Sequence, residues 1–130
     1  MLRSQFAKGD TEMSEKAPEI ITSYHAHVYF NADTTETARE LRGEIEARFE
    51  GVMQMGRFHE KLVGPHPQWS YQVLFEPDQF PTIIQWLSLN RRGLDVFVHP
   101  ETGDGLIDHS DHVMWLGNSH VLELGIFNKD

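Results

Sequence analysis

The sequence contains no cysteine, so disulfide bonds and thiolate chemistry are both excluded. It is also poor in basic residues, with 11 Lys and Arg against 20 Asp and Glu and a net charge of −9 when histidine is neutral. Nucleic acids and anionic membranes are bound through basic patches, so this balance argues against both as partners. No apolar run approaches the roughly 20 residues of a membrane span, and the first residues lack the apolar stretch of a secretory signal. We therefore expect a cytoplasmic protein.

Histidine is abundant by contrast, with 8 residues in a chain of 130. Histidine is the commonest metal ligand and the side chain that titrates near neutral pH. A chain of this length most often forms one domain. We expect a disordered, polar N-terminal arm over residues 1–20 and a single domain over residues 21–130.

The spacing of apolar residues predicts an α+β domain. Residues 24–30 alternate with the two-residue period of a strand, and residues 34–50 repeat apolar side chains every three or four positions, as a helix does. Later segments give strand-like runs at 57–63, 70–76 and 94–100, helical spacing at 78–90, and one or two strand-like pieces within 112–127. This order predicts a ferredoxin-like split β-α-β sandwich, an antiparallel sheet with two helices on one face and a C-terminal strand extension.

Local signals mark the ends of the first helix. Asp33 with Glu36 resembles a capping box at its start, and Gly51 provides a stop.

Three histidines fall on one predicted face of this sheet. Val28 and its in-phase neighbours suit the helix-covered side, so His25 and His27 face the open side. In the fourth strand Val98 suits the core, which turns His99 to the open side as well. Because the first and fourth strands are neighbours in this topology, the three imidazoles should meet, as metal ligands do. The alternative interpretation is that these histidines simply form a polar, solvent-exposed sheet face, which explains their spacing equally well.

The segment "GPHPQWSYQ" (64–72) holds a histidine between two prolines. Pro65 and Pro67 restrict the backbone, so His66 is preorganised at little entropic expense. We expect His66 to overhang the open sheet face at the rim of a pocket, from its own or a partner subunit, as a substrate-binding acid–base residue. A turn histidine bonded to backbone and a direct metal ligand are the two alternatives for His66. Three aromatic residues are assigned to substrate binding: Trp69, Tyr71 and Tyr29.

Four stretches together resemble the small DOPA 4,5-dioxygenase family: "YHAHVYF", "GPHPQWSY", "WLSLNRRGLDVFVHPETGD" and "DHSDHVMWLG". The resemblance implies a dimer-forming ferredoxin-like subunit that uses nonheme iron(II) and O₂ to open a catechol such as DOPA by extradiol cleavage. The product would be a muconic semialdehyde. Carried over to this sequence, the family's histidines are His25, His27, His66, His99 and His109.

We assign His25, His27 and His99 to the metal, and His66 and His109 to catalysis. The resemblance does not decide which histidines are ligands and which are acid or base, and zinc or nickel can occupy such a site in purified protein. A carboxylate ligand is open among Glu60, Asp95, Asp104, Asp108, Asp111 and Glu123, and a three-histidine site is equally open.

Two other classes of function compete with the dioxygenase. One is a dimeric α+β barrel protein that binds a metal or an aromatic ligand without turnover. The other is a metal-free enzyme in which the histidines serve only as acid and base. The histidine pair beside His99 favours a metal.

Overall fold

The computed structural model describes residues 20–128. The arm expected over residues 1–20 lies outside this range except for Ile20. In chain order the elements are β1 (Ser23–Phe30), η1 (Ala32–Thr34), α2 (Thr35–Arg48), β2 (Gln54–Met55), β3 (Trp69–Phe75), η2 (Pro77–Gln79), α3 (Phe80–Asn90), β4 (Val96–Glu101), α4 (Gly105–Asp108), β5 (Met114–Leu116) and η3 (Leu124–Asn128).

The five strands form one antiparallel sheet in the order β2-β3-β1-β4-β5. The first four strands have the ferredoxin-like order, which confirms the predicted fold class. β5 is the strand extension and pairs with the outer edge of β4. The central strand β1 lies between β3 and β4, so its side chains are flanked on both sides by those of its neighbours.

One face of the sheet carries the hydrophobic core. Val28 and its in-phase neighbours on β1 pack with Leu41 and Ile45 of α2 and with Ile83 and Leu87 of α3, all of them fully buried. Both helices therefore cover the same face, which follows from the right-handed crossovers of this topology. The polar residues of β1 are left on the opposite face.

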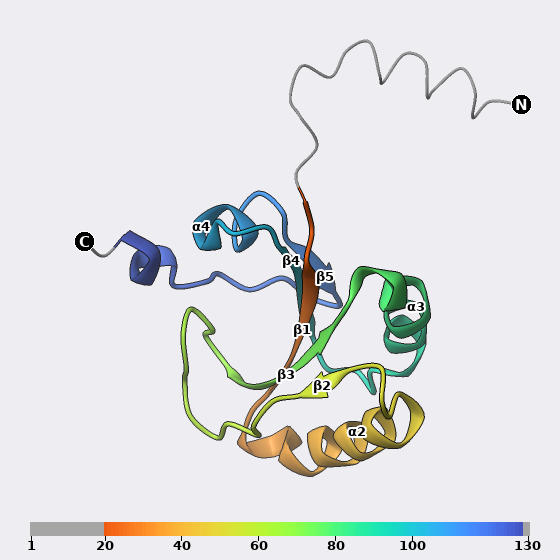
Figure 1. Cartoon of the computed structure of the whole chain (residues 1–130). Coiled ribbons are helices and arrows are strands. Elements are labelled where there is room, and N and C mark those ends of the chain that lie inside the picture. Colours follow the sequence, from red (N-terminus) through yellow and green to blue (C-terminus); the bar gives the residue numbers. More distant parts are fainter. Residues whose placement is uncertain (1–19, 129–130) are drawn as a thin grey trace, which may run out of the picture.

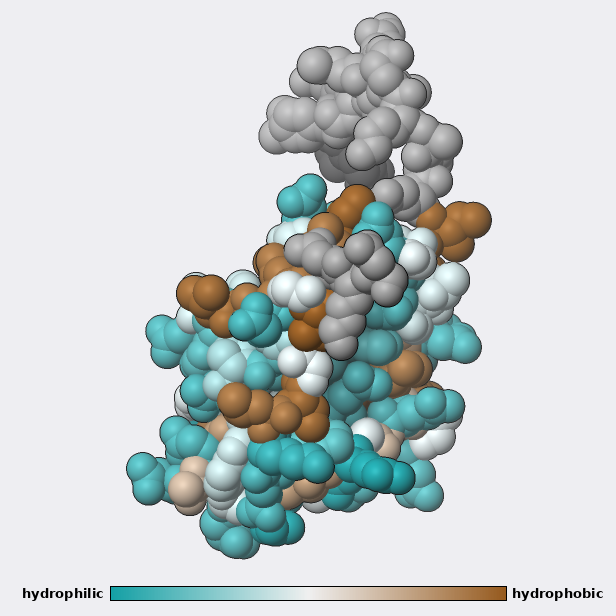
Figure 2. All heavy atoms as spheres, turned by 90° about the vertical axis from the view of Figure 1, so that its left-hand side faces the viewer, coloured by the Kyte–Doolittle hydropathy of each residue, from teal (hydrophilic) through white to brown (hydrophobic). Residues whose placement is uncertain are grey.

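That opposite face is covered by the protein's own loops. The segment joining β2 to β3 and the C-terminal segment lie across from α3 (Figure 1), and the backbone N–H of Glu123 donates to the carbonyl of Pro65 at 2.8 Å. Trp115 of β5 stacks on Phe97 of β4 at 4.7 Å between ring centroids. On this side Figure 2 shows hydrophobic side chains between hydrophilic ones rather than one continuous apolar surface. The homodimer implied by the family resemblance stays a prediction.

Two of the predicted elements differ from the structure. Residues 57–63 do not form a strand; His59 makes a single bridge to Ser70, and the pairing with β3 comes from β2 upstream. The run lacks alternating apolar side chains, so it does not continue as a strand, and its contacts with the sheet include the His59–Ser70 bridge and the packing of Phe58 on Phe30 and Tyr71. The C-terminal part of the predicted extension forms the 3-10 helix η3 instead of a strand.

The start of the first helical segment also differs in detail. Asn31, not Asp33, provides the cap: its side chain accepts from the backbone N–H of Thr34, whose hydroxyl accepts from the N–H of Asn31. This is the reciprocal pattern of a capping box. Within residues 20–128, no helix has both the length and the apolar character needed to cross a membrane.

Candidate metal centre

Three imidazoles meet on the open face where β1 lies beside β4. His25 is the direct cross-strand partner of His99, and His27 follows two residues later on the same face of β1. One ring nitrogen from each of the three lies within 4.8 Å of the others. His27 and His99 are buried, and His25 is partly exposed. The period of the strand and the register of the pair therefore suffice to assemble the cluster.

Two nitrogen atoms of this cluster are close enough to share one ion, and a nitrogen of His25 lies within 4.8 Å of both residues. Nε2 of His27 lies 3.1 Å from Nε2 of His99, whereas two nitrogen ligands about 2.1 Å from one metal can be up to about 4.2 Å apart. Nδ1 of His99 lies 2.9 Å from the carbonyl oxygen of Pro100. A carbonyl only accepts, so Nδ1 carries the proton and Nε2 presents its lone pair. The donor set thus fits a metal that prefers imidazole, such as iron or zinc.

Burial keeps these imidazoles neutral. It lowers the pKa of His99 to about 3, although the hydrogen bond to Pro100 acts in the opposite direction. Burial and the neighbouring His66 hold the pKa of His27 well below its usual value. Burial also lowers the pKa of His25, against the attraction of Glu101. Neutral imidazole is the form that binds metals.

His66 lies beside this cluster, on the loop between β2 and β3. It is 8% exposed, and its ring centroid is 4.2 Å from that of His27. The hydroxyl of Tyr29 lies 2.8 Å from Nδ1 of His66. Burial lowers the pKa of His66 to about 4 and raises the pKa of the Tyr29 phenol, so both groups are neutral at pH 7. Tyr29 therefore contacts His66, where we had expected it to bind the substrate.

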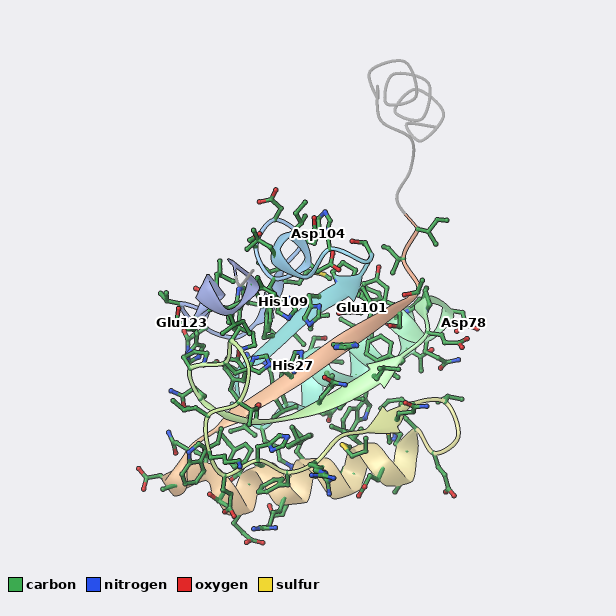
Figure 3. The ribbon with its side chains drawn as sticks, turned by 60° about the vertical axis from the view of Figure 1, so that its left-hand side comes forward. His27, Asp78, Glu101, Asp104, His109 and Glu123 are labelled. Carbon is green, nitrogen blue, oxygen red and sulfur yellow. The ribbon has the colours of Figure 1, made fainter. Side chains whose placement is uncertain are left out.

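His109 closes the other side of the cluster. It follows α4, and its ring centroid is 4.0 Å from that of His99. Its Nδ1 donates to the carbonyl of Gly105 at 2.7 Å, which leaves the lone pair on Nε2. Phe127 of the C-terminal segment packs on the outer face of the ring at 4.7 Å. Figure 3 shows His27 and His109 on the same side of the sheet, with Glu101 near the end of β4.

Glu101 is a member of this site that our sequence reasoning missed. Its carboxylate lies 3.5 Å from Nδ1 of His99 and 3.8 Å from Nδ1 of His25. In His99 this Nδ1 lies on the ring edge away from the Nε2 atom that approaches His27, where a carboxylate orients a ligand and raises its basicity. Glu101 is two residues after His99 on β4, so the two-residue period of a strand places both on the same face. The sequence therefore contained the information needed to predict that Glu101 lies at this site.

The six candidate carboxylates lie outside the cluster. In the part of the chain that the structure describes, the close group of potential ligands consists of histidines alone. Asp95 accepts from His120 at 2.8 Å and from the backbone of Asn118, while Asp108 accepts from the backbone and hydroxyl of Thr102. The others cap α4, pair with Arg39 or lie at the surface: Asp104, Glu60, Asp111 and Glu123.

Trp69 and Tyr71 lie on the helix-covered side of the sheet and not beside the histidines. Tyr71 is 1% exposed and belongs to the hydrophobic core, next to Phe58 and Phe30. Trp69 packs against the same core through Phe30. Their placement does not support the expected role in enclosing a substrate ring. The histidine side carries other aromatic residues, among them Phe97 and Trp115.

Comparisons with known proteins give matches over most of this chain. The model of the Dopa 4,5-dioxygenase family matches residues 24–126. The chain is 32% identical over 124 residues to the DOPA 4,5-dioxygenase of Amanita muscaria, covering 90% of this chain and 54% of that one. It is 34% identical over 118 residues to an uncharacterized 21.2 kDa protein of Botryotinia fuckeliana, covering 82% and 64%. The chain thus spans little more than half the length of these curated relatives.

A crystal structure of a candidate dioxygenase from Nostoc punctiforme PCC 73102 is also similar. It is 46% identical in sequence and superimposes with a TM-score of 0.79, covering 83% of this chain and 92% of that one.

Proposed function

The chain belongs to the Dopa 4,5-dioxygenase family, and we propose that it is a nonheme iron(II)-dependent extradiol dioxygenase. It inserts O₂ into a catechol such as DOPA and gives a muconic semialdehyde-type product. The observation that carries the proposal is the cluster of three neutral imidazoles with two further histidines beside it. Extradiol chemistry needs ligands that leave coordination positions open, together with acid–base groups that are not ligands.

His25, His27 and His99 would hold the iron. When bound, iron(II) would bring the catechol oxygens and O₂ together and pass electrons from the catechol ring to O₂. The chain supplies three neutral nitrogen donors and no carboxylate among them, so a bound iron keeps its positive charge and favours the anionic form of a catechol. Phe97, fully buried next to His27, excludes water from the inner side of the site.

The hydrogen bonds of the two remaining histidines give them different roles. We assign the Tyr29 hydroxyl, 2.8 Å from Nδ1 of His66, as the donor to that nitrogen, which places the proton of the neutral ring on Nε2. Nδ1 of His109 donates to Gly105, so its Nε2 can accept a proton. We assign His109 as the base that takes a catechol proton and later returns it to the oxygen anion, and His66 as the hydrogen-bond donor that stabilises this anion through Nε2. Such groups typically contribute 10²–10⁴-fold to rate.

Oxygen uptake tests the proposal directly. Protein reconstituted with iron(II) under anaerobic conditions should consume one O₂ per catechol and form a yellow semialdehyde when mixed with DOPA in air. His66→Ala and His109→Ala should each lower the rate by about 10²-fold or more. Iron-loaded protein that consumes no oxygen with any catechol would favour the alternative, a metal- or ligand-binding protein without turnover.

A homodimer and a cytoplasmic location complete the proposal. The first is implied by the family and the second by the lack of cysteine.

A further inference from the structure

A small cavity opens next to the metal centre, on the side of His27 away from His99. It measures about 200 Å³ and lies between β3 and the loop segment 56–66. His27 and His66 form its inner wall. Gln72, the cross-strand partner of His27, lines it as well, and Arg57 and His59 come from the loop. The cavity is therefore continuous with the site at which a catechol would react.

The lining of this cavity is positively charged in an acidic protein. The chain has 20 acidic and 11 basic residues, yet none of the residues that line the cavity is Asp or Glu. Its Arg57 has no ion pair or side-chain hydrogen bond with any residue between 20 and 128. Neighbouring arginines differ, because Arg39 pairs with Glu60 and Arg42 with Glu46. An unpaired guanidinium beside a polar cavity is suited to bind an anion.

We propose that this cavity binds the side-chain carboxylate of the substrate, and that Arg57 makes the protein specific for catechols bearing a carboxylate. The inference rests on the proposed function, because it places the catechol ring at the histidine cluster. The carboxylate then meets Arg57, and the amide of Gln72 is available to donate to it. No acidic side chain lines the cavity, so an amino group on the substrate gains no ion pair there. The substrate class is thus catecholic arylcarboxylates, of which an amino acid such as DOPA is one member.

Four catechols distinguish the effect of the substrate carboxylate from the effect of the substrate ammonium group. DOPA has both the carboxylate and the ammonium group, 3-(3,4-dihydroxyphenyl)propionate has only the carboxylate, dopamine has only the ammonium, and 4-ethylcatechol has neither. We expect DOPA and the propionate to have kcat/KM values within about threefold of each other and at least about tenfold above the other two. A charge-assisted hydrogen bond is typically associated with a difference of about 10- to 100-fold.

Variants of Arg57 test the assignment. Arg57→Gln should lower kcat/KM for the two carboxylates by at least about tenfold and leave 4-ethylcatechol unchanged, because it has no group to lose. Arg57→Lys should restore part of the loss, since it keeps the charge without the planar fork. Arg48→Gln is the matched control: Arg48 ends α2 and packs over Trp86 at 5.5 Å on the helix-covered side, so all four catechols should be unaffected.

Binding separates a failure of this inference from a failure of the proposed function. Protein loaded with redox-inert zinc is titrated by calorimetry with the propionate and with 4-ethylcatechol. If no catechol is turned over but Arg57→Gln still weakens propionate binding about tenfold, the proposed reaction fails and the carboxylate site stands. If turnover occurs and Arg57→Gln has equal effects on all four catechols, or none, the carboxylate site is refuted. Preferential use of dopamine would refute it as well.

Discussion

The metal-free protein should lose stability between pH 7.5 and pH 5.0. Burial lowers the pKa of His66 to about 4 and that of His99 to about 3, whereas a histidine in the unfolded chain titrates near 6.5. Below pH 6.5 the unfolded chain therefore binds protons that the folded protein does not, and unfolding becomes more favourable as the pH falls. The effect is negligible at pH 7.5 and grows until the pH reaches the folded-state pKa.

The size of this loss follows from the two pKa values. At pH 5.0 the pH is about 1.5 units below the unfolded pKa and still above both folded values. One pKa unit corresponds to 1.36 kcal/mol, so each histidine destabilises the folded state by about 2 kcal/mol, and the two together by about 4 kcal/mol. His27, whose pKa is also lowered, acts in the same direction. A small domain is stable by about 5–15 kcal/mol, so the change is large.

Urea unfolding of chelator-treated protein measures this change at fixed protein concentration. The free energy of unfolding should fall by about 4 kcal/mol or more from pH 7.5 to pH 5.0, above the range in which carboxylates titrate. In His66→Gln the fall should be smaller by about 2 kcal/mol, because one buried histidine has been removed. Equal stability at the two pH values would show that the cluster is not held neutral and would refute the reasoning.

Three substitutions test individual contacts. Tyr29→Phe removes the donor to Nδ1 of His66, so kcat should fall by about tenfold or more and its pH profile should shift, with bound iron unchanged in a metal assay. Glu101→Gln removes the charge beside the ring edges of the ligands and should weaken metal affinity by about 10–100-fold in a competition titration. Gly117→Ala should destabilise the protein by about 1–3 kcal/mol in urea unfolding, since the residue has φ of +91° and a Cβ would lie 2.5 Å from Asp95.

The sequence was sufficient to predict how the histidines of the cluster come together. Alternation along β1 separates His25 and His27 from the core residue Val28, and the split β-α-β order makes β1 and β4 neighbours. Both arguments depend on periodicity and connectivity, which a single sequence contains. The exact register that pairs His25 with His99 depends on how the strands pack. The sequence predicted only that both residues lie at the same end of the sheet.

The surroundings of the cluster were less predictable. Tyr71 follows the same alternation as Val73 and Phe75, which marks all three as core residues. Its closeness to His66 in the sequence therefore did not indicate that it lies beside His66 in the structure. The position of the loop before β3 depends on tertiary contacts, such as the hydrogen bond from Glu123 to Pro65, that no local pattern encodes. The arrangement of His109 depends on α4, a helix of four residues within a segment that appears as a polar loop.

Bound iron in three variants tests the central claim most directly. After anaerobic loading and desalting, we expect His27→Ala and His99→Ala to lose most of their iron and all activity, because each removes one of the clustered nitrogens. His66→Ala should keep its iron and lose rate, and His59→Ala, outside the cluster, should keep its iron as the control. If His66→Ala is instead the variant without iron, or if His27→Ala and His99→Ala keep iron at the level of the unmodified protein, the three-histidine centre is wrong.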